Sequence, residues 1–566
     1  MSPGRPPEFS SQTRQADVAR LAGETFDLLI IGGGITGAAV ARDAVTRGLK
    51  VALVEKSDFA SGTSSRSSKL IHGGLRYLEN FEWKLVFEAL SERSFLLKSA
   101  PNLVRPLPFY LPVYEGDAHG RGILDLGLWL YDLLALFRAP GAHKRLSARA
   151  MREAIPFLKD GGLRGGFHYY DASMWDDRLV IETLRSAREL GAVVVNYVEA
   201  RAPLADWQGM QVRPVSTPGA PDLPAEFPVR ASQVIVCGGP WTDLLGQAVA
   251  ASEWHRWLTP SKGVHLVFDL KRLPIPGAMV MSHPEDGRIS FVIPRPDMGP
   301  GITIVGTTDS PTHPEPERAR IEREDVAYLM SLLEKYFPAL QLTTSDILSA
   351  YVGVRPLVGA NPGAAPGDSS AQLQKVSREH HIGWGPGGSV WAAGGKYTTH
   401  RTMGQEIVDF ALERREWVSQ LGTVGRSDTR TPVNPRVLPE AVARARAAET
   451  HPVAESLWAL YGAEAREIAE LDRQALGKSA AAIADPVGFP CLRGQLLHAL
   501  KYGAVLRLED FWFRRAPLYL ALPDQGEAWV DALAEVWAHA TGGDAPAEAA
   551  LLRAAIARES AWKREL

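Results

Sequence analysis

Residues 26–55 read FDLLIIGGGITGAAVARDAVTRGLKVALVE. An apolar run leads directly into three glycines, and small residues at helical spacing follow until Gly48. A second apolar run then ends at Glu55, 18 residues after Gly37. Short runs rich in Ile, Leu and Val are typical of strands that are buried on both faces of a parallel sheet. The stretch therefore predicts a strand, a helix and a second parallel strand, which together form the βαβ unit of an α/β fold.

The glycines of this stretch follow the pattern G-x-G-x-x-G, which indicates dinucleotide binding when it joins a strand to a helix. The first glycine allows a tight turn, the second lets the backbone approach a pyrophosphate, and the third lets the helix pack closely on the strand. The helix N-terminus offers N–H groups to the phosphates, and the acidic residue after the second strand accepts a hydrogen bond from a ribose with a free 2′-hydroxyl. FAD and NAD both fit this description. The residues expected to hold the dinucleotide are Gly32, Gly34, Ile35, Thr36, Gly37 and Glu55.

Two later glycine-rich segments favour a flavin over a nicotinamide cofactor. VIVCGGPWT, at residues 234–242, is similar to the second glycine segment of flavoproteins, where a strand returns beneath the fingerprint. GGKYTTHR, at residues 394–401, precedes a helix whose positive end would stabilise the negative charge of a reduced flavin. These segments add Gly238, Gly239, Trp241, Gly395, Lys396, Thr398 and Thr399 to the expected cofactor contacts.

Composition and charge exclude several classes of protein. Among 566 residues, 62 Lys and Arg nearly balance 65 Asp and Glu, and the net charge of -3 argues against a dedicated nucleic-acid binder. Two cysteines, Cys237 and Cys491, build neither a disulfide framework nor a structural zinc site, so we expect a reducing, cytoplasmic setting and no metal. We expect Cys237 to be a buried, unreactive thiol. The N-terminus lacks an apolar signal region and no uncharged apolar run is long enough for a spanning helix, so neither secretion nor a transmembrane segment is expected.

Several further segments, together with those above, carry a resemblance to a known family. They are TSSRSSKLIHGGLRYLE at residues 63–79, YDASMWDDRLV at 170–180, SKGVHLVF at 261–268 and YVGVRPL at 351–357. In this order they resemble the FAD-dependent glycerol-3-phosphate dehydrogenases of the aerobic, quinone-linked type. SSKLIHGGLRYLE is far more specific than the glycine fingerprint, and LEDFWFRR at residues 508–515 resembles the family's helical C-terminal domain.

The resemblance implies an α/β fold in three parts. A glutathione-reductase-like FAD-binding domain carries a substrate domain with an antiparallel sheet, and an α-helical domain follows at the C-terminus. Independently, the alternation of apolar and polar residues within 265–309 predicts antiparallel strands with one polar face. The expected boundaries are a flexible tail at 1–25, the FAD-binding domain at 26–260 with its return segment at 376–424, the substrate domain at 261–375, and the helical domain at 425–566.

The substrate implied by the resemblance is sn-glycerol 3-phosphate, which carries a phosphate dianion and a secondary alcohol. Arginine suits the phosphate because its planar fork pairs with two oxygens at once. Histidine suits the removal of the hydroxyl proton near neutral pH. His72 and His265 are the candidates for the base, and the sequence does not decide between them; Asp309 is expected to hold a histidine or an arginine in place. The matching positions assign substrate contacts to Arg76, Tyr77, Thr308, Arg355 and Arg378, and catalytic roles to His72, His265 and Lys396.

The resemblance also assigns contacts with FAD outside the glycine segments. Six Ser and Thr residues within 61–68 are too polar for a protein core, and they lead directly into the family's most specific string. The additional positions assigned to the cofactor are Lys56, Thr63, Ser64, Ser68, Lys69, Leu70, Ile71 and Val198.

Three alternatives to a quinone-linked dehydrogenase stay open at this point. The family's oxidase branch, which reduces O2, carries an insertion in the later substrate region, whereas here only 40 residues lead from Arg355 to Lys396 without an obvious inserted domain. A second alternative is another flavoenzyme similar to D-amino-acid oxidase, and a third is a non-catalytic flavoprotein. The resemblance favours the dehydrogenase, with a membrane quinone and the bilayer surface as partners, peripheral attachment to the cytoplasmic membrane, and a homodimer.

ILDLGLWLYDLLALF, at residues 123–137, is the most apolar stretch of the chain. Asp125 and Asp132 are seven residues apart, so they share one helical face opposite Leu, Trp and Phe. One interpretation is a helix that lies in a membrane surface. The other is an amphipathic helix that docks its apolar face on the protein's own core.

Overall fold

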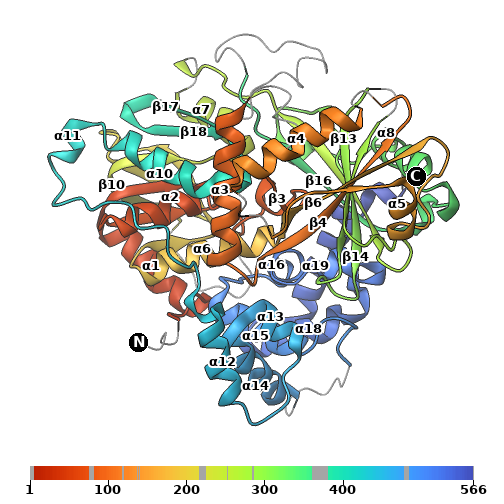
Figure 1. Cartoon of the computed structure of the whole chain (residues 1–566). Coiled ribbons are helices and arrows are strands. Elements are labelled where there is room, and N and C mark those ends of the chain that lie inside the picture. The colour runs from red at the N-terminus through yellow and green to blue at the C-terminus, as the bar shows by residue number, and fades with distance from the viewer. Residues whose placement is uncertain are drawn as a thin grey trace.

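The computed structural model describes residues 6–74, 82–117, 120–136, 138, 140–215, 225–250, 253–283, 286–359, 380–476 and 484–564. These residues form two β-sheets and a group of C-terminal helices. In the view of Figure 1, the first sheet lies on the left, the second on the right, and most of the C-terminal helices lie below them. The predicted α/β fold, with an antiparallel second sheet and a helical C-terminal region, is confirmed.

The first sheet contains the βαβ unit that residues 26–55 predict. Strand β1 (Thr25–Ile31) pairs in parallel with β2 (Val51–Val54) and with β10 (Phe227–Val236), and helix α2 (Ile35–Thr46) connects β1 to β2. The other strands are β7 (Val193–Val195) beside β2, β18 (Val390–Gly394) and β17 (His380–Trp384) beyond β10, and the hairpin of β8 (Val198–Pro203) and β9 (Gly209–Pro214).

Alternate side chains of β1 enter two apolar layers, one on each face of the sheet. Leu28 and Ile30 pack with residues of α2, α6 (Asp176–Glu189) and α10 (His400–Ala411). Leu29 and Ile31 pack with α1 (Ser11–Gly23) and the β8–β9 hairpin. A strand buried on both faces is what its continuous apolar run predicts.

Helix α1 differs from the flexible tail that the sequence predicts for residues 1–25. The Ser10 side chain caps the helix by accepting a hydrogen bond from its third residue. Val18 and Leu21 are buried against the first sheet, and Arg14 donates to two backbone carbonyls that follow β7. Two large apolar residues in 13 give the helix too weak a pattern for prediction, so its position depends on these long-range contacts.

The second sheet takes its strands from two separate parts of the chain. Its order is β15-β11-β14-β13-β12-β4-β6-β3, with β16 beside β11 and β5 beside β6. Among the strand pairs of this sheet within the described residues, only β4 with β12 is parallel. The strands of the later part are β11 (Ser261–Asp269), β12 (Ala278–Ser282), β13 (Ile289–Arg295), β14 (Ile302–Gly306), β15 (Ser310–Pro311) and β16 (Ile347–Arg355). The strands of the earlier part are β3 (Leu70–Ile71), β4 (Val104–Tyr114), β5 (Lys144–Leu146) and β6 (Leu163–Met174). The second sheet therefore begins well before the predicted boundary at residue 261.

Helices flank the second sheet and make up the described C-terminal region. Those beside the sheets are α3 (Trp83–Ser99), α4 (Arg121–Leu134), α5 (Ala148–Ala154), α7 (Thr242–Ala250), α8 (Arg323–Tyr336) and α11 (Arg415–Val418). The C-terminal group comprises α12 (Pro439–Ala447), α13 (Glu455–Tyr461), α14 (Ala465–Leu476), α15 (Leu492–Tyr502), α16 (Leu508–Arg514), α17 (Leu518–Ala521), α18 (Val530–Thr541) and α19 (Ala545–Glu559). Within the described part of the chain, no helix has the length and apolarity to cross a bilayer.

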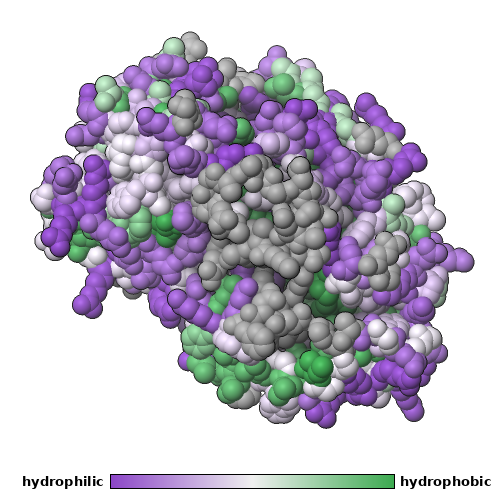
Figure 2. All heavy atoms as spheres, turned by 90° about the horizontal axis from the view of Figure 1, so that it is seen from above, coloured by the Kyte–Doolittle hydropathy of each residue, from purple (hydrophilic) through white to green (hydrophobic). Residues whose placement is uncertain are grey.

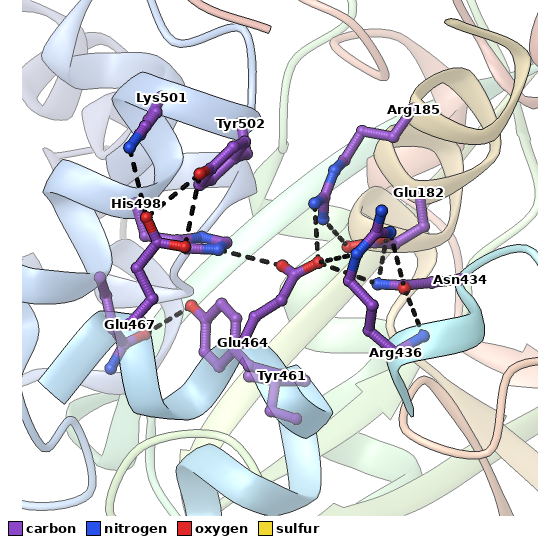
Figure 3. Close-up of polar contacts among 12 residues, drawn as sticks. Glu182, Arg185, Asn434, Arg436, Tyr461, Glu464, Glu467, His498, Lys501 and Tyr502 are labelled. Carbon is purple, nitrogen blue, oxygen red and sulfur yellow. Dashed lines mark hydrogen bonds and ion pairs between the residues drawn. The ribbon is translucent and has the colours of Figure 1, made fainter. Parts of the chain in front are cut away.

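A buried polar network joins the C-terminal helices to α6 (Figure 3). Glu464 lies at its centre, where it accepts a hydrogen bond from Arg185 at 2.9 Å and pairs with His498 at 3.0 Å. Arg185 also donates to Glu182, and Asn434 donates to the second carboxylate oxygen of Glu182. All five side chains are buried. Because buried charges are tolerated only when they are paired, this network fixes how the C-terminal helices dock.

Candidate active site

A cavity of about 1200 Å³ is lined by residues of both sheets and of the C-terminal helices. Its walls include the turn after β1, the end of β2, parts of residues 60–72, strand β16, and the segment that leads into α10. Pockets for small ligands usually measure roughly 300–1,000 Å³. The cavity is therefore large enough for a dinucleotide together with a small substrate.

The turn between β1 and α2 requires its glycines. Gly32 has φ +109°, and a Cβ atom there would lie 2.4 Å from the backbone oxygen of Cys237. A Cβ atom on Gly37 would lie 1.9 Å from the backbone oxygen of Gly32. The fingerprint thus brings the helix N-terminus against the cavity, as a pyrophosphate needs. Cys237 is buried, and this burial raises the pKa of its thiol to about 12, so it remains a neutral thiol as expected.

Glu55 stands at the end of β2 and lines the same cavity. Its carboxylate accepts hydrogen bonds from the N–H groups of Gly33 at 2.7 Å and Ser57 at 2.8 Å. Burial raises the pKa of Glu55, although the two backbone donors oppose this effect. Ser64 accepts a hydrogen bond from the N–H of Ile35 at 3.0 Å and so braces the start of α2. An acidic residue behind a glycine cradle at a helix N-terminus fits an adenine dinucleotide with a free ribose 2′-hydroxyl.

His265 lies on β11 and faces the cavity from the second sheet. Its Nε2 atom is 2.8 Å from the Ser68 hydroxyl, and its ring stacks on Tyr351 with centroids 4.7 Å apart. Burial lowers the pKa of His265 well below its ordinary value, and the cations of Arg355 and Lys69 lower it further. The imidazole is therefore neutral at physiological pH, which is the state of a hydrogen-bond acceptor or a base.

Arg355 ends β16 and is held in place by several acceptors. Its Nη1 atom is 3.1 Å from the Asp309 carboxylate, and its Nη2 atom donates to the Thr307 hydroxyl and the Thr308 carbonyl at 3.0 Å. Asp309 thus holds an arginine in place, as the sequence predicts. A Cβ atom on Gly263 would lie 2.4 Å from Nη2, so a larger residue there would displace this guanidinium.

The residues predicted for the site fall into three groups. Those that line the cavity are Gly32, Gly34, Ile35, Thr36, Glu55, Lys56, Thr63, Ser64, Ser68, Leu70, His72, Val198, Gly238, Gly239, Trp241, His265, Arg355, Gly395, Lys396 and Thr398. Those that stand outside its lining are Gly37, Lys69, Ile71, Thr308 and Thr399. Those that lie outside the described residues are Arg76, Tyr77 and Arg378.

The second group supports the wall of the cavity from behind. The Lys69 ammonium forms a buried ion pair with Asp176 at 2.5 Å and donates to the backbone oxygen of Ser65 at 3.1 Å. The Thr308 hydroxyl accepts a hydrogen bond from the N–H of Val264 at 3.0 Å. These contacts fix the loop that carries Ser68 and the segment of Thr308 and Asp309 that holds Arg355.

Sequence reasoning missed what the end of the chain contributes. Arg66 lines the cavity and forms two hydrogen bonds with Glu559, at 2.9 and 3.0 Å. Trp562 lines the cavity as well. At another part of the wall, Glu317 accepts hydrogen bonds from Trp241 at 2.5 Å and Lys56 at 3.1 Å. These pairs join residues 76 to 493 positions apart, so no local pattern reveals them.

Comparison with known proteins places this site in a family. The family described as FAD dependent oxidoreductase matches residues 27–409. The aerobic glycerol-3-phosphate dehydrogenase of Bacillus subtilis (strain 168) is 38% identical over 410 residues, which cover 72% of this chain and 70% of the relative. The chain belongs to the FAD dependent oxidoreductase family. The enzyme of the same name from Staphylococcus aureus (strain MRSA252) is 37% identical over the same lengths. Membership makes the chain an FAD-dependent oxidoreductase.

One solved structure extends the similarity to the C-terminal helices. The glycerol-3-phosphate dehydrogenase from Bacillus halodurans, complexed with FAD, superposes with a TM-score of 0.73 at 26% identity and covers 97% of this chain and 98% of its own. L-alpha-glycerophosphate oxidase from Mycoplasma pneumoniae shares the fold, with a TM-score of 0.51 at 16% identity over 69% of this chain and 95% of its own. The family's cofactor fits the glycine cradle and the acidic residue described above.

Proposed function

We propose that this enzyme oxidises sn-glycerol 3-phosphate at C2 to dihydroxyacetone phosphate and passes the electrons to a membrane quinone. The observation that carries the proposal is that His72, His265, Arg355 and Lys396 line the same cavity as the glycine fingerprint. The names of the relatives support this substrate. Bound FAD would supply the hydride acceptor. The side chains of the cavity would bind the phosphate and take the hydroxyl proton.

Arg355 provides the charge that the phosphate requires. Its ion pair with Asp309 and its bonds to backbone carbonyls orient the guanidinium before substrate arrives. Preorganisation of this kind lowers the entropic cost of binding. Arg76, Tyr77 and Arg378 are proposed as further phosphate ligands on the family resemblance, and Lys396 as the residue that fixes the flavin and substrate relative to each other.

His72 is proposed as the base that takes the C2 hydroxyl proton, and His265 as a neutral contact for the substrate. His265 already shares a hydrogen bond with Ser68, and its lowered pKa makes it a weak base. His72→Asn should therefore lower kcat by at least a hundredfold, and His265→Asn should mainly raise KM. The reverse pattern would assign the base to His265.

Anaerobic mixing tests the proposed reaction. Addition of sn-glycerol 3-phosphate should bleach the visible absorbance of the bound flavin and release one dihydroxyacetone phosphate per FAD. Glycerol and sn-glycerol 1-phosphate are the matched controls, because the first lacks the phosphate and the second has the opposite configuration. An unchanged flavin spectrum in the presence of sn-glycerol 3-phosphate would show that this compound is not the substrate.

The electron acceptor and the location of the enzyme are separate parts of the proposal. We propose a homodimer attached peripherally to the cytoplasmic membrane, where quinones are dissolved. A soluble quinone analogue should be reduced at the rate of substrate oxidation, with little peroxide formed in air. Stoichiometric peroxide without quinone reduction would instead identify an oxidase.

A further inference from the structure

Helix α4 buries Leu128 and Tyr131 in the core but exposes a stripe of large apolar side chains. The side chains of this stripe have exposed fractions of 49–71%, whereas the two aspartates of the helix are buried. The exposed residues are Ile123, Leu126, Trp129, Leu133 and Leu136, the last of them two residues beyond the helix. Their spacing of three or four positions forms one continuous stripe. Of the two interpretations of this sequence, the one in which the apolar face docks on the protein's own core does not describe the structure.

Ion pairs hold the helix in this orientation. Asp125 pairs with Arg145, and Asp132 accepts hydrogen bonds from the backbone and the ring of His143 at 3.0 and 2.8 Å. Tyr131, on the same inner face, is buried and donates to the carboxylate of Asp171 at 2.9 Å. A rotation that buried the leucines would break all these contacts. The outward apolar stripe is therefore fixed by the fold.

The apolar surface continues onto the neighbouring helix. Trp83 and Phe87 lie one turn apart on α3, and both are exposed. Figure 2 shows the molecule from above, with hydrophobic side chains gathered towards the bottom of the picture. This side corresponds to the front of Figure 1, where α4 lies. Two exposed tryptophans in this surface suit the boundary between lipid headgroups and acyl chains.

Four exposed cations lie near this surface. Arg121 and Arg138 stand at the two ends of α4, Lys84 follows Trp83 on α3, and Lys144 starts β5; all four are exposed. The two aspartates of α4, the only acidic residues within the helix, are turned away from the surface. An apolar stripe bordered by cations complements a membrane with anionic headgroups.

The size of the stripe favours a lipid surface over a second copy of the chain. A helix of 14 residues is about 21 Å long and about 10 Å wide, so its exposed face covers on the order of 200 Å². A stable protein–protein interface needs about 800 Å² from each partner. A single shallow face is sufficient for a helix that enters a bilayer interface by about 5–10 Å.

We propose that α4, together with the first turns of α3, docks the enzyme on an anionic lipid bilayer. The proposal deepens the peripheral attachment proposed above and rests on it. Leu126 and Trp129 enter the headgroup region, while the cations at the helix ends contact lipid phosphates.

Vesicle sedimentation with the FAD-loaded full chain tests this docking. We expect the protein to co-sediment with vesicles of phosphatidylglycerol and phosphatidylcholine, and more weakly with phosphatidylcholine alone. Leu126→Ser with Trp129→Ser should reduce the bound fraction at least tenfold. Leu190→Ser with Trp384→Ser is the matched control, because these side chains are similarly exposed but lie elsewhere, and it should bind as the original chain does.

The outcomes separate the docking surface from the proposed reaction. Unchanged vesicle binding by the Leu126/Trp129 variant would overturn the docking proposal. So would a change in its oligomeric state by light scattering, which would assign the stripe to a contact between copies. Flavin bleaching by sn-glycerol 3-phosphate is measured without lipid and should be equal in all three proteins. If bleaching fails while vesicle binding holds, the substrate is wrong and the docking surface stands.

Discussion

Arg355 shows how several residues can define the geometry of one side chain. Its guanidinium occupies the space that the missing side chain of Gly263 leaves, and its donors are oriented by Asp309 and neighbouring carbonyls. Lysine carries the same charge but lacks the planar fork. We expect Arg355→Lys to raise KM by about tenfold or more, because the phosphate loses an oriented partner. Steady-state kinetics measure this, with Arg272→Lys as a control.

Arg272 forms a comparable paired contact with Asp346, at 2.7 and 3.1 Å, away from the cavity. Its replacement by lysine should leave KM unchanged. Equal KM values for Arg355→Lys and the original enzyme would show that Arg355 does not bind the phosphate.

Tyr131 positions the backbone beside His72. Its hydroxyl accepts a hydrogen bond from the N–H of Gly73 at 2.9 Å while it donates to Asp171. Burial raises the pKa of Tyr131 well above its ordinary value, and the Asp171 charge adds to this effect, so the phenol stays protonated. Tyr131→Phe keeps the ring but loses both bonds. We expect kcat to fall severalfold, because flavin reduction slows, while KM stays constant.

A loss of packing alone would not separate kcat from KM in this way. The control for Tyr131→Phe is Tyr114→Phe, which removes a hydroxyl that donates to a backbone carbonyl at 2.8 Å outside the cavity. Stopped-flow measurement of flavin reduction compares the two variants. Identical rates in both would show that Tyr131 has no part in positioning His72.

At the scale of elements, local sequence patterns predicted the β1–α2–β2 unit. They did not predict elements whose conformation or orientation depends on contacts with other segments. The β1–α2–β2 unit was predictable because its strand pattern, its turn glycines and its helix spacing all point the same way. Strand β4 was not predicted, because Pro106, Pro108 and Pro112 argue against a strand. These prolines sit at alternate positions and remove N–H groups from one edge only, so the other edge pairs fully with β6. The orientation of α4 likewise depends on Arg145 and His143, which follow the helix.

Glu464 allows a test of the junction between α6 and the C-terminal helices. Burial tends to raise its pKa, but Arg185 and His498 outweigh burial and lower the pKa below the ordinary value. A lowered carboxyl pKa stabilises the fold above the ordinary pKa of about 4.5, and this contribution is lost as pH falls towards the lowered value. Glu464→Gln should therefore destabilise the protein by about 3–5 kcal/mol at pH 7.

Thermal unfolding at several pH values measures this effect. The difference in Tm between Glu464→Gln and the original chain should shrink as pH falls below the ordinary carboxyl pKa. Glu455→Gln is the control, since Glu455 pairs with Arg446 on the surface and its loss should change Tm little. A difference in Tm that stays constant with pH would exclude the charge of Glu464 as its cause.

At the scale of the whole molecule, the sequence predicted which residues reach the cavity better than it predicted how the cavity is closed. Gly32, Glu55 and Arg355 lie in motifs whose neighbours identify them. The pair of Arg66 and Glu559 spans 493 positions and lies in no shared motif. Such contacts depend on how the C-terminal helices dock, which is decided by buried pairs such as Glu464 with Arg185.

Because residues of both sheets and of the last helices line the cavity, FAD should stabilise regions far from its glycine cradle. Ligand binding to the folded state alone adds about 2.7 kcal/mol at a hundredfold excess over Kd. We expect FAD removal to lower Tm and to speed hydrogen exchange at 507–514 and 558–562, whose residues Arg507, Arg514, Arg558 and Trp562 line the cavity. Exchange at 465–476 is the control, because α14 contributes nothing to the lining. Added FAD should restore the protection, whereas NAD should not. If removal of FAD leaves 558–562 as protected as before, the C-terminal region borders the cavity without responding to the cofactor.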